Sequence, residues 1–355
     1  MRGAVASPGY ASRRLPSAMV VMFLAFAFLV AACGGGNQSS GSAKHYNIAF
    51  LAAASDNGFN KAAYQGAVDV AAKNNASVQI FDGKFDGTVQ FNQMQDLVAS
   101  KRFDAFIILA NDGVSIASVV KDAIGKGMKV AAANNPIGPD LVTLQPQVQG
   151  ITTTVGSEQH ASSTKQAEFA VKLCGSKNPC RVVLFSGNLQ FPFDRIRLEA
   201  WKAVFSQHSN IQMVASVEGG YDRQKSLTVM QDVLQAHPNV DLVISAADQH
   251  IFGAELALTQ AGKKVDATGA NGVMLLGRGA ATDSVTKVKA GLWAGTYVDL
   301  PYTDGKLAAE QLFKDLRGES GIQRAIDVDQ FSPVGAIATQ TSLQKDPSFK
   351  GEWTG

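Results

Sequence analysis

Beyond residue 45, short apolar runs alternate with amphipathic stretches, and this alternation constrains the fold more than any other feature of the sequence. The first apolar runs have the length and the β-branched or aromatic character of buried strands. The expected strands are residues 46–53, 77–81, 104–110 and 128–133, and the expected helices between them are residues 60–73, 88–101 and 114–125. Because strands that alternate with helices at this spacing form parallel sheets with right-handed crossovers, we predict a doubly wound α/β sheet.

The alternation stops at residues 136–154 and then begins again. This stretch contains Pro139 and Pro146 and has no helical period, so we interpret it as a crossing segment. The second series has expected helices at residues 158–173, 193–207, 223–236, 250–261 and 282–290, and expected strands at residues 181–185, 211–217, 240–245 and 273–276. We therefore predict two parallel sheets of similar size, encoded one after the other.

The last third of the chain does not belong wholly to the second sheet. We expect a strand at residues 293–298, a helix at 302–316 and an extended stretch at 328–337. Crossings near Thr154, Asp299 and Phe331 would give two lobes that share a three-segment hinge and close around a ligand. The predicted N-terminal lobe is residues 45–154 plus 300–330, the C-terminal lobe is residues 155–299 plus 331–343, and residues 344–355 form a tail.

The first 44 residues have the features of an export signal followed by a linker. Two arginines precede an uncharged run that ends in small residues, which indicates a secretory signal peptide at residues 1–32. The run closes on Val30-Ala31-Ala32-Cys33, which resembles the bacterial lipobox, so we expect Cys33 to carry a lipid and to anchor the chain to the cell membrane. Residues 33–44 are rich in Gly and Ser, a composition typical of a flexible linker.

The charge balance gives no support for a nucleic-acid partner. The 355 residues carry a formal charge of +2, but Arg2, Arg13 and Arg14 precede Cys33 and no acidic residue does, so cleavage there would leave −1. A nearly neutral chain lacks the basic surface that nucleic acids require. With 46% hydrophobic and 17% charged residues, the composition is typical of a well-packed soluble α/β protein that is long enough for two domains.

Cysteine usage agrees with export. If Cys33 carries a lipid, Cys174 and Cys180 remain, at the end of an expected helix and the start of an expected strand. In an oxidising compartment we expect these two to form a disulfide, and two free structural thiols are the alternative. The short loop between them offers too few ligands for a zinc site.

The strongest functional signal follows the apolar run at residues 181–185. Pro192 opens the next expected helix, so Arg195 and Arg197 lie in its first turns, beyond the carboxyl end of a strand. Open α/β sheets bind their ligands at that edge. Because positive charge opposes the dipole at a helix N-terminus, an arginine there indicates another use, such as holding two oxygens of a hydroxyl-rich or anionic ligand. Solvated arginines, or arginines paired with Glu199, are the alternative.

Catalytic and cofactor motifs are absent from the sequence. It contains no Gly-x-Ser-x-Gly elbow, no Gly-x-Gly-x-x-Gly loop after the first expected strand and no Walker lysine. The histidines lack metal-ligand spacing, and we interpret them as surface or capping residues; they are His45, His160, His208, His237 and His250. We therefore predict that the protein is not an enzyme and that it uses no metal or cofactor.

The order of the elements and four short motifs resemble the type I periplasmic sugar-binding proteins, the ribose-binding and LacI-like family whose members deliver carbohydrates to ABC transporters. The resemblance extends from His45 to about Leu343. The motifs are Asp56-Asn57-Gly58-Phe59-Asn60, Asp194-Arg195-Ile196-Arg197-Leu198-Glu199-Ala200-Trp201, Tyr221-Asp222-Arg223-Gln224-Lys225 and Gly295-Thr296-Tyr297-Val298-Asp299-Leu300-Pro301.

The resemblance implies a set of ligand-contacting residues. The set is Asn57, Phe59, Asn60, Asn134, Asn135, Arg197, Tyr221 and Asp299. In the family, residues at these positions include an arginine that grips sugar hydroxyls, here Arg197, and an aromatic ring that covers a face of the sugar, here Tyr221. A polar residue at a hinge crossing, here Asp299, also contacts the ligand.

Three departures from the family pattern bear on the ligand. Asn134 and Asn135 stand where relatives typically have an Asp-Arg pair, Ala247 stands where an amide contact is common, and the loop at residues 277–280 lacks an aspartate that many relatives carry. Because carboxylates that bind ribose or glucose are lost, the ligand need not be either sugar. Amides that both donate and accept, together with aromatic faces, still suit a neutral polyhydroxy compound.

Each of these residues also has a structural interpretation. Asn57 and Asn60 are good helix caps, and the asparagines before Pro136 are good turn formers. Core packing is the alternative for Phe59 and, to a lesser degree, for Tyr221, which follows two glycines in a loop. The aspartate before Leu300 is suited to capping the helix that follows it.

The resemblance implies an extracytoplasmic, lipid-anchored binding protein. We expect it to act as a monomer that closes over a monosaccharide or sugar alcohol and presents it to the permease of an ABC transporter. The alternative is a ligand sensor of the same fold that signals to a membrane partner.

Overall fold

The structure, a computed structural model, describes residues 44–355. The predicted signal peptide at residues 1–32, the lipidation site at Cys33 and all but the last residue of the predicted linker 33–44 lie outside the described residues. Within the described part of the chain, no helix combines the length and the apolar character that crossing a membrane requires.

The first lobe is built on a six-stranded sheet with the strand order β11-β5-β4-β3-β1-β2, in which all paired neighbours are parallel. Its strands are β1 (Tyr46–Ala52), β2 (Ala76–Asp82), β3 (Ala105–Ile108), β4 (Lys129–Ala133), β5 (Thr153–Gly156) and β11 (Ala325–Asp327). Its helices are α1 (Gly58–Ala71), α2 (Gly87–Ser100), α3 (Ala117–Gly125) and α9 (Pro301–Leu316).

The second lobe has a matching six-stranded sheet with the order β12-β10-β9-β8-β6-β7. Its strands are β6 (Cys180–Ser186), β7 (Ile211–Glu218), β8 (Leu242–Ser245), β9 (Met274–Arg278), β10 (Gly295–Tyr297) and β12 (Ile337–Ala338). Its helices are α4 (Gln159–Cys174), α5 (Pro192–Phe205), α6 (Arg223–Ala236), α7 (Asp248–Gln260), α8 (Thr282–Lys289) and α10 (Gln340–Lys345).

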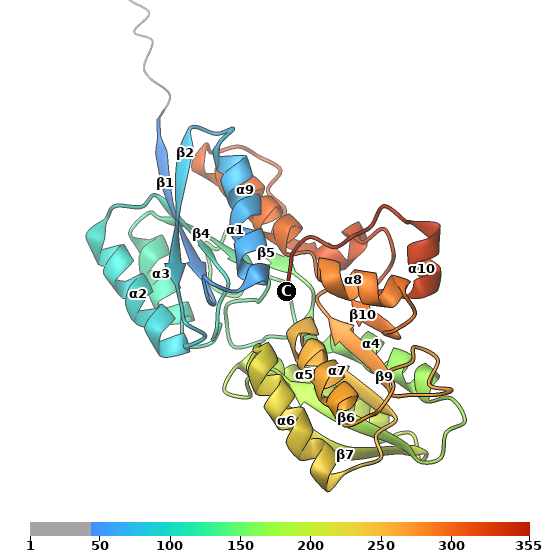
Figure 1. The fold of residues 1–355 in the computed structure, drawn as a ribbon. Coiled ribbons are helices and arrows are strands. Elements are labelled where there is room, and N and C mark those ends of the chain that lie inside the picture. Colours follow the sequence, from blue (N-terminus) through green and yellow to red (C-terminus); the bar gives the residue numbers. More distant parts are fainter. Residues whose placement is uncertain (1–43) are drawn as a thin grey trace, which may run out of the picture. The chain divides into compact units, whose positions relative to one another are not determined.

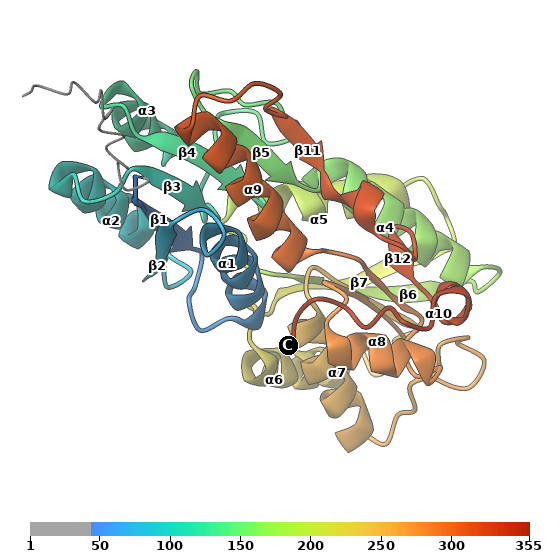
Figure 2. The same ribbon diagram turned by 90° about the horizontal axis from the view of Figure 1, so that it is seen from above.

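Helices cover both faces of each sheet, as Figures 1 and 2 show. Alternate residues of β1 serve opposite layers: Ile48 and Phe50 belong to the apolar layer that includes α1 and α9, whereas Ala49 and Leu51 belong to the layer that includes α2 and α3. In the second lobe, α4 and α5 pack on one face and α6, α7 and α8 on the other. The predicted fold class, two doubly wound parallel lobes, is confirmed.

Three chain segments run between the lobes. One follows β5, one follows β10 and enters α9, and one runs from β11 through the 3₁₀ helix η1 (Val328–Phe331) to β12. The predicted extended stretch at residues 328–337 is wrong over most of its length: the Asp327 side chain accepts a hydrogen bond from the Asp329 N–H and starts η1, a turn follows, and only Ile337 lies in a strand. The expectation of parallel strands throughout also fails at one edge, since β12 returns from the first lobe and pairs antiparallel to β10.

Helix starts gather at the carboxyl ends of the strands, where the lobes face each other. Four helices begin at an acidic or amide side chain that accepts backbone N–H groups; these caps are Asn57, Asp86, Glu158 and Asp222. Two others, α5 and α9, have proline in their first turn, where no N–H donor is required. The loops that carry these starts therefore supply most of the side chains between the lobes.

The last ten residues follow α10 and pack against both lobes. Figures 1 and 2 show the C-terminal end near α1 of the first lobe and α8 of the second. Residues 344–355 are more than the predicted tail, because Phe349 and Trp353 within them are buried.

Candidate functional site

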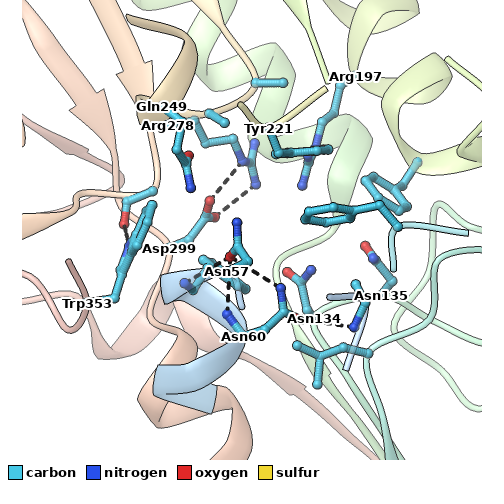
Figure 3. Close-up of a pocket in the computed structure, with 18 residues that line it drawn as sticks. Asn57, Asn60, Asn134, Asn135, Arg197, Tyr221, Gln249, Arg278, Asp299 and Trp353 are labelled. Atoms are coloured by element: carbon cyan, nitrogen blue, oxygen red, sulfur yellow. Dashed lines mark hydrogen bonds and ion pairs between the residues drawn. The ribbon is translucent and has the colours of Figure 1, made fainter. Parts of the chain in front are cut away.

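A pocket lies between the two lobes at the carboxyl ends of their strands (Figure 3). Its space, including the part open to solvent, is about 580 Å³. The lining residues are Ala53, Asn57, Phe59, Asn60, Phe85, Leu109, Asn134, Asn135, Phe193, Arg197, Tyr221, Ala246, Ala247, Gln249, Arg278, Gly279, Asp299 and Trp353.

All eight residues that the sequence analysis named as ligand contacts line this one pocket. They are Asn57, Phe59, Asn60, Asn134, Asn135, Arg197, Tyr221 and Asp299. They come from loops after β1, β4, β7 and β10 and from α1 and α5. Which of their atoms are available to a ligand depends on the hydrogen bonds that each side chain already makes within the protein.

Arg197, in α5, is 5% exposed and is held in place by three hydrogen bonds. Its Nε donates to Gln159 at 2.8 Å, and its Nη1 donates to Asp194 at 3.2 Å and to the Tyr221 hydroxyl at 3.1 Å. Its Nη2 has no partner among the described residues. Arg195 is exposed and donates instead to main-chain carbonyls of the preceding loop, so the alternative pairing with Glu199 is not found for either arginine in residues 44–355.

Asp194 is the buried counter-charge of Arg197. It accepts hydrogen bonds from Arg197, from the Tyr221 hydroxyl at 2.8 Å and from the Asn188 N–H at 2.7 Å. Burial raises the pKa of the Asp194 carboxyl, while these donors act in the opposite direction. The cation in the pocket wall is therefore matched by an anion directly behind it.

Tyr221 is fixed by its backbone as well as by its hydroxyl. Its φ of 60° lies in the left-handed region, and its N–H donates to Nε2 of His250 at 2.9 Å. His250 is fully buried, so its interpretation as a surface or capping residue is wrong; burial lowers the pKa of its imidazole to about 3 and keeps it neutral. The Tyr221 ring stacks on Phe85 of the first lobe, with centroids 5.4 Å apart.

Arg278 and Asp299 form a second ion pair in the pocket wall, in which Arg278 is buried and Asp299 is half-buried (Figure 3). Arg278 ends β9 and donates through Nε and Nη2 to the two oxygens of Asp299, at 3.1 and 3.0 Å. Its Nη1 donates to Ser162 at 3.1 Å, and its guanidinium lies 4.5 Å from the Tyr297 ring centroid. Helix α9 has no side-chain cap, so the alternative role of Asp299 as a cap is not found.

Asn57 and Asn60, at the start of α1, make structural hydrogen bonds and also line the pocket. Asn57 Oδ1 caps α1 by accepting from the Phe59 and Asn60 N–H groups, at 3.0 and 3.3 Å, which supports its structural interpretation. Its Nδ2 has no partner in the described part of the chain. Asn60 is more fully engaged, since its Oδ1 accepts from the Ala53 N–H and its Nδ2 donates to Asn57.

Asn134 and Asn135, after β4, also combine structural roles with pocket lining. Asn134 has a φ of 65°, which asparagine tolerates better than most residues, so it does form the turn after β4. Its side-chain amide nevertheless lines the pocket and has no partner in residues 44–355. Asn135 is 4% exposed and is used structurally, accepting from Gln159 at 3.2 Å and donating to the Ala110 carbonyl at 3.2 Å.

Several lining residues were missed by the sequence analysis. Gln249, two positions after Ala247, brings to the pocket an amide without a partner among the described residues. Arg278 had a signal that was not used: a lone arginine at the end of an apolar strand needs a buried partner, and Asp299 ends the next strand. Phe85 lies in the loop after β2, Phe193 lies in the first turn of α5, and Trp353 lies beyond the region of family resemblance.

The pocket therefore combines paired charges, unpartnered amides and aromatic rings. The polar atoms without partners among the described residues belong to Asn57, Asn134, Arg197 and Gln249, which surround the same space in Figure 3. The rings of Phe59, Phe85, Phe193, Tyr221 and Trp353 form the rest of the wall. A hinged two-lobed fold with such a pocket defines the class of solute-binding proteins.

The chain belongs to the periplasmic binding protein family, because residues 48–320 match the periplasmic binding protein domain. The ribose import binding protein of Bacillus subtilis is 25% identical over 320 residues, which cover 88% of this chain and 97% of that protein. The D-allose-binding periplasmic protein of Escherichia coli is 24% identical over 287 residues, which cover 81% and 83%.

Solved structures agree on the fold. An ABC transporter solute-binding protein from Bacillus halodurans, with bound myo-inositol, aligns with a TM-score of 0.72 at 20% identity and covers 87% of this chain and 99% of that one. The similarity to the type I sugar-binding proteins is thus confirmed. Membership of this family makes the chain a binding protein and not an enzyme.

Proposed function

We propose that the protein captures a small, neutral polyhydroxy compound, a monosaccharide or a sugar alcohol, between its lobes and delivers it to an ABC permease. The observation that carries this proposal is the pairing of both pocket arginines with the protein's own carboxylates, Arg197 with Asp194 and Arg278 with Asp299. Because each cation is already matched by a carboxylate, an anionic ligand would bring a negative charge that neither pocket arginine is free to balance. A neutral ligand meets no such cost.

The remaining groups suit hydroxyls and sugar rings. The amides of Asn134 and Gln249 can both donate and accept, which matches a hydroxyl that does the same, and Asn57 adds a donor through its Nδ2. Aromatic rings on several sides favour a ligand whose C–H faces are apolar. The names of similar proteins point the same way, since they concern ribose, D-allose and myo-inositol.

A ligand screen tests the proposal. We expect one or more of the pentoses, hexoses, inositols or linear polyols to raise the thermal midpoint of the purified protein, because a ligand at 100 times its dissociation constant adds about 2.7 kcal/mol of stability. Isothermal titration calorimetry of the best compounds then gives their affinities. If charged sugar phosphates or sugar acids bind and neutral compounds do not, the proposed ligand class is wrong.

Arg197 provides the sharpest variant for that screen. We expect Arg197→Ala to abolish binding while the chain stays folded, and Arg197→Lys to weaken binding strongly because lysine lacks the planar fork. Arg195→Ala is the matched control, since Arg195 lies in the same helix but not in the pocket, and it should bind as the wild type does. Equal affinities for wild type and Arg197→Ala would mean that the pocket has been misassigned.

We also infer that Cys33 anchors the protein to the outer face of the cell membrane, on the basis of the lipobox-like Val30-Ala31-Ala32-Cys33. A single acyl chain binds a membrane only weakly, so stable anchoring requires more than one chain on this cysteine. Cys33→Ala should therefore release the protein from the membrane fraction or leave it uncleaved, as shown by fractionation and mass spectrometry of the N-terminus. A cleaved Cys33→Ala form that stays in the membrane fraction would exclude the lipid.

A further inference from the structure

The last ten residues, 346–355, form a segment that contacts both lobes and contributes to the pocket; we call it the C-terminal strap. It follows α10 and lies beyond residues 48–320, the part of the chain that matches the family domain. Its residue Trp353 is 5% exposed and is one of the pocket-lining side chains. The strap therefore contributes to the pocket from outside the part of the chain that matches the family domain.

The strap is anchored firmly to the second lobe. Phe349 is buried in the apolar layer that α6, α7 and α8 share, and its carbonyl accepts from Lys289 at 2.8 Å. The Thr282 N–H and hydroxyl donate to the Trp353 carbonyl at 2.8 and 3.0 Å. The indole Nε1 of Trp353 donates to the Gly279 carbonyl at 2.7 Å, so the polar atom of the ring is satisfied within the protein.

Its contacts with the first lobe are fewer and more exposed. Glu352 accepts from the N–H of Thr303, in α9, at 3.0 Å and from the Thr303 hydroxyl at 2.5 Å, and both side chains are only half-buried. The Trp353 ring meets Phe59, at the start of α1, edge-on with centroids 5.8 Å apart. Separation of the lobes would break these contacts and leave the strap on the second lobe.

The first lobe leaves space for the strap at Gly58. A Cβ atom at this position would lie 2.0 Å from the Thr354 carbonyl oxygen, closer than any side chain permits. The glycine therefore lets the strap backbone pass directly over the N-terminus of α1, beside the cap Asn57. The strap and the first loop of the pocket are thus built to fit each other.

We propose that Trp353 is a specificity-determining wall of the binding site and that the Glu352–Thr303 contact latches this wall in place when the lobes close. With Nε1 bound to Gly279, the indole offers the pocket its apolar surface, which suits the flat C–H face of a ring-shaped polyhydroxy compound better than a linear polyol. This inference rests on the proposed function, and it narrows the ligand class to cyclic sugars and cyclitols.

The test compares ligands and variants in one calorimetric panel. The probes are D-ribose, D-allose and myo-inositol as ring compounds and ribitol and D-mannitol as linear ones. We expect the wild type to prefer a ring compound and Trp353→Ala to bind it about tenfold more weakly, with little change for linear polyols. Trp353→Phe keeps an aromatic wall but loses the Nε1 hydrogen bond, and it should retain most of the preference.

Fluorescence and kinetics give two further readouts. The chain has three tryptophans, and Trp201 and Trp293 are fully buried outside the pocket, so a ligand-induced change in emission should disappear in Trp353→Phe. Glu352→Ala and Thr303→Val should each raise the ligand dissociation rate several-fold, whereas Glu319→Ala, at an exposed position away from the strap, should not. Circular dichroism checks that every variant is folded.

The outcomes separate this inference from the proposed function. If the wild type binds no neutral polyhydroxy compound, the proposed function fails and this inference fails with it. If the wild type binds a ring compound but Trp353→Ala binds every probe as tightly, only the role of Trp353 is overturned. A wild type that prefers linear polyols overturns the role of Trp353 as a wall for ring compounds. A Glu352→Ala variant with an unchanged ligand dissociation rate overturns the role of the Glu352–Thr303 contact as a latch.

Discussion

At the residue scale, the chemistry of the pocket depends on which polar atoms are already used. Arg278 gives three of its nitrogen atoms to Asp299 and Ser162, and Arg197 uses two of its own for Gln159, Asp194 and Tyr221. These bonds hold each guanidinium in one orientation before any ligand arrives. Preorganised donors bind a ligand more tightly because less conformational entropy is lost on binding.

Asp304 is a buried acid that does not line the pocket. It lies in the first turns of α9, is 2% exposed, and its Oδ1 has no hydrogen-bond partner among the described residues. Burial raises the pKa of Asp304 well above its usual value, and the carboxylates of Asp299 and Glu352 add to this effect. Folding therefore favours the protonated form of this side chain.

We expect Asp304→Asn to raise the free energy of unfolding at pH 7, because the amide has a similar shape and no charge to desolvate. A raised folded-state pKa means that the folded chain holds the proton more tightly than the unfolded chain. The contribution of Asp304 to the free energy of unfolding is thus most favourable below about pH 4. This contribution falls as the pH rises toward the pKa of the folded state, by about 1.4 kcal/mol for each unit by which the folded-state pKa exceeds the unfolded-state pKa.

Urea denaturation from pH 4 to pH 8 measures this difference. The gap between Asp304→Asn and the wild type should widen as the pH rises. The exposed Asp96, in α2, provides the control variant Asp96→Asn, which should follow the wild type at every pH. An Asp304→Asn variant that is less stable than the wild type at pH 7 would show that the carboxylate is needed in its charged form.

At the element scale, a disulfide joins the end of one helix to the start of a central strand. Cys174 is the last residue of α4 and Cys180 the first residue of β6, and the structure bonds them to each other. Both are buried in the apolar layer that also holds Trp201 and Phe205. The bond therefore ties α4, which supplies Gln159 and Ser162 near the pocket, to the sheet that it covers.

Removal of this disulfide should destabilise the protein moderately. In the chain-entropy description, opening so short a loop lowers the free energy of unfolding by about 2 kcal/mol. We expect this loss for the double variant Cys174→Ala/Cys180→Ala in urea denaturation, with little change in ligand affinity because neither cysteine lines the pocket. Wild type treated with reductant should behave like the variant, and equal stability of the oxidised and reduced wild type would contradict the prediction.

At the scale of the whole molecule, side-chain contacts among the described residues join the two lobes in addition to the three chain crossings. Phe85 of the first lobe stacks on Tyr221 of the second, and Gln159 of α4 donates to Asn135 of the first lobe. The strap adds the Glu352–Thr303 contact. A ligand shifts such a two-lobed protein toward closure only by binding the closed arrangement more tightly, so residues that touch both lobes and the pocket carry the coupling.

Local pattern was enough to predict the architecture, and together with the family resemblance it predicted eight of the eighteen residues that line the pocket. Strand and helix periods are properties of short windows of sequence. The predicted crossing segment at residues 136–154 is wrong, because it leads into β5 of the same sheet and the chain changes sheet only after β5, whereas the predicted change near residue 299 agrees with the structure. Arg197 was predicted from its place at a helix start just beyond a strand, at the edge where the carboxyl ends of parallel strands meet. The other seven residues, Asn57 among them, were predicted from the family resemblance, and all eight line one pocket.

Residues whose roles depend on a distant partner escaped prediction. In the sequence His250 is an isolated histidine, but in the structure it is buried and accepts a hydrogen bond from the N–H of Tyr221, 29 positions away along the chain. Strand β12 pairs with β10, and this pairing is antiparallel because the chain enters β12 from the other lobe. No local window contains such information.

The sequence by itself determined the fold class, the family resemblance and the strand-end residues, because periodicity and short motifs are written in consecutive positions. Only the tertiary structure decided which polar atoms remain free for a ligand, since that depends on partners such as Asp194 for Arg197 and Asp299 for Arg278. Only the tertiary structure placed Trp353 in the pocket as well. A segment with no repeat and no motif acquires its neighbours solely through packing, here against Phe59 and Gly279.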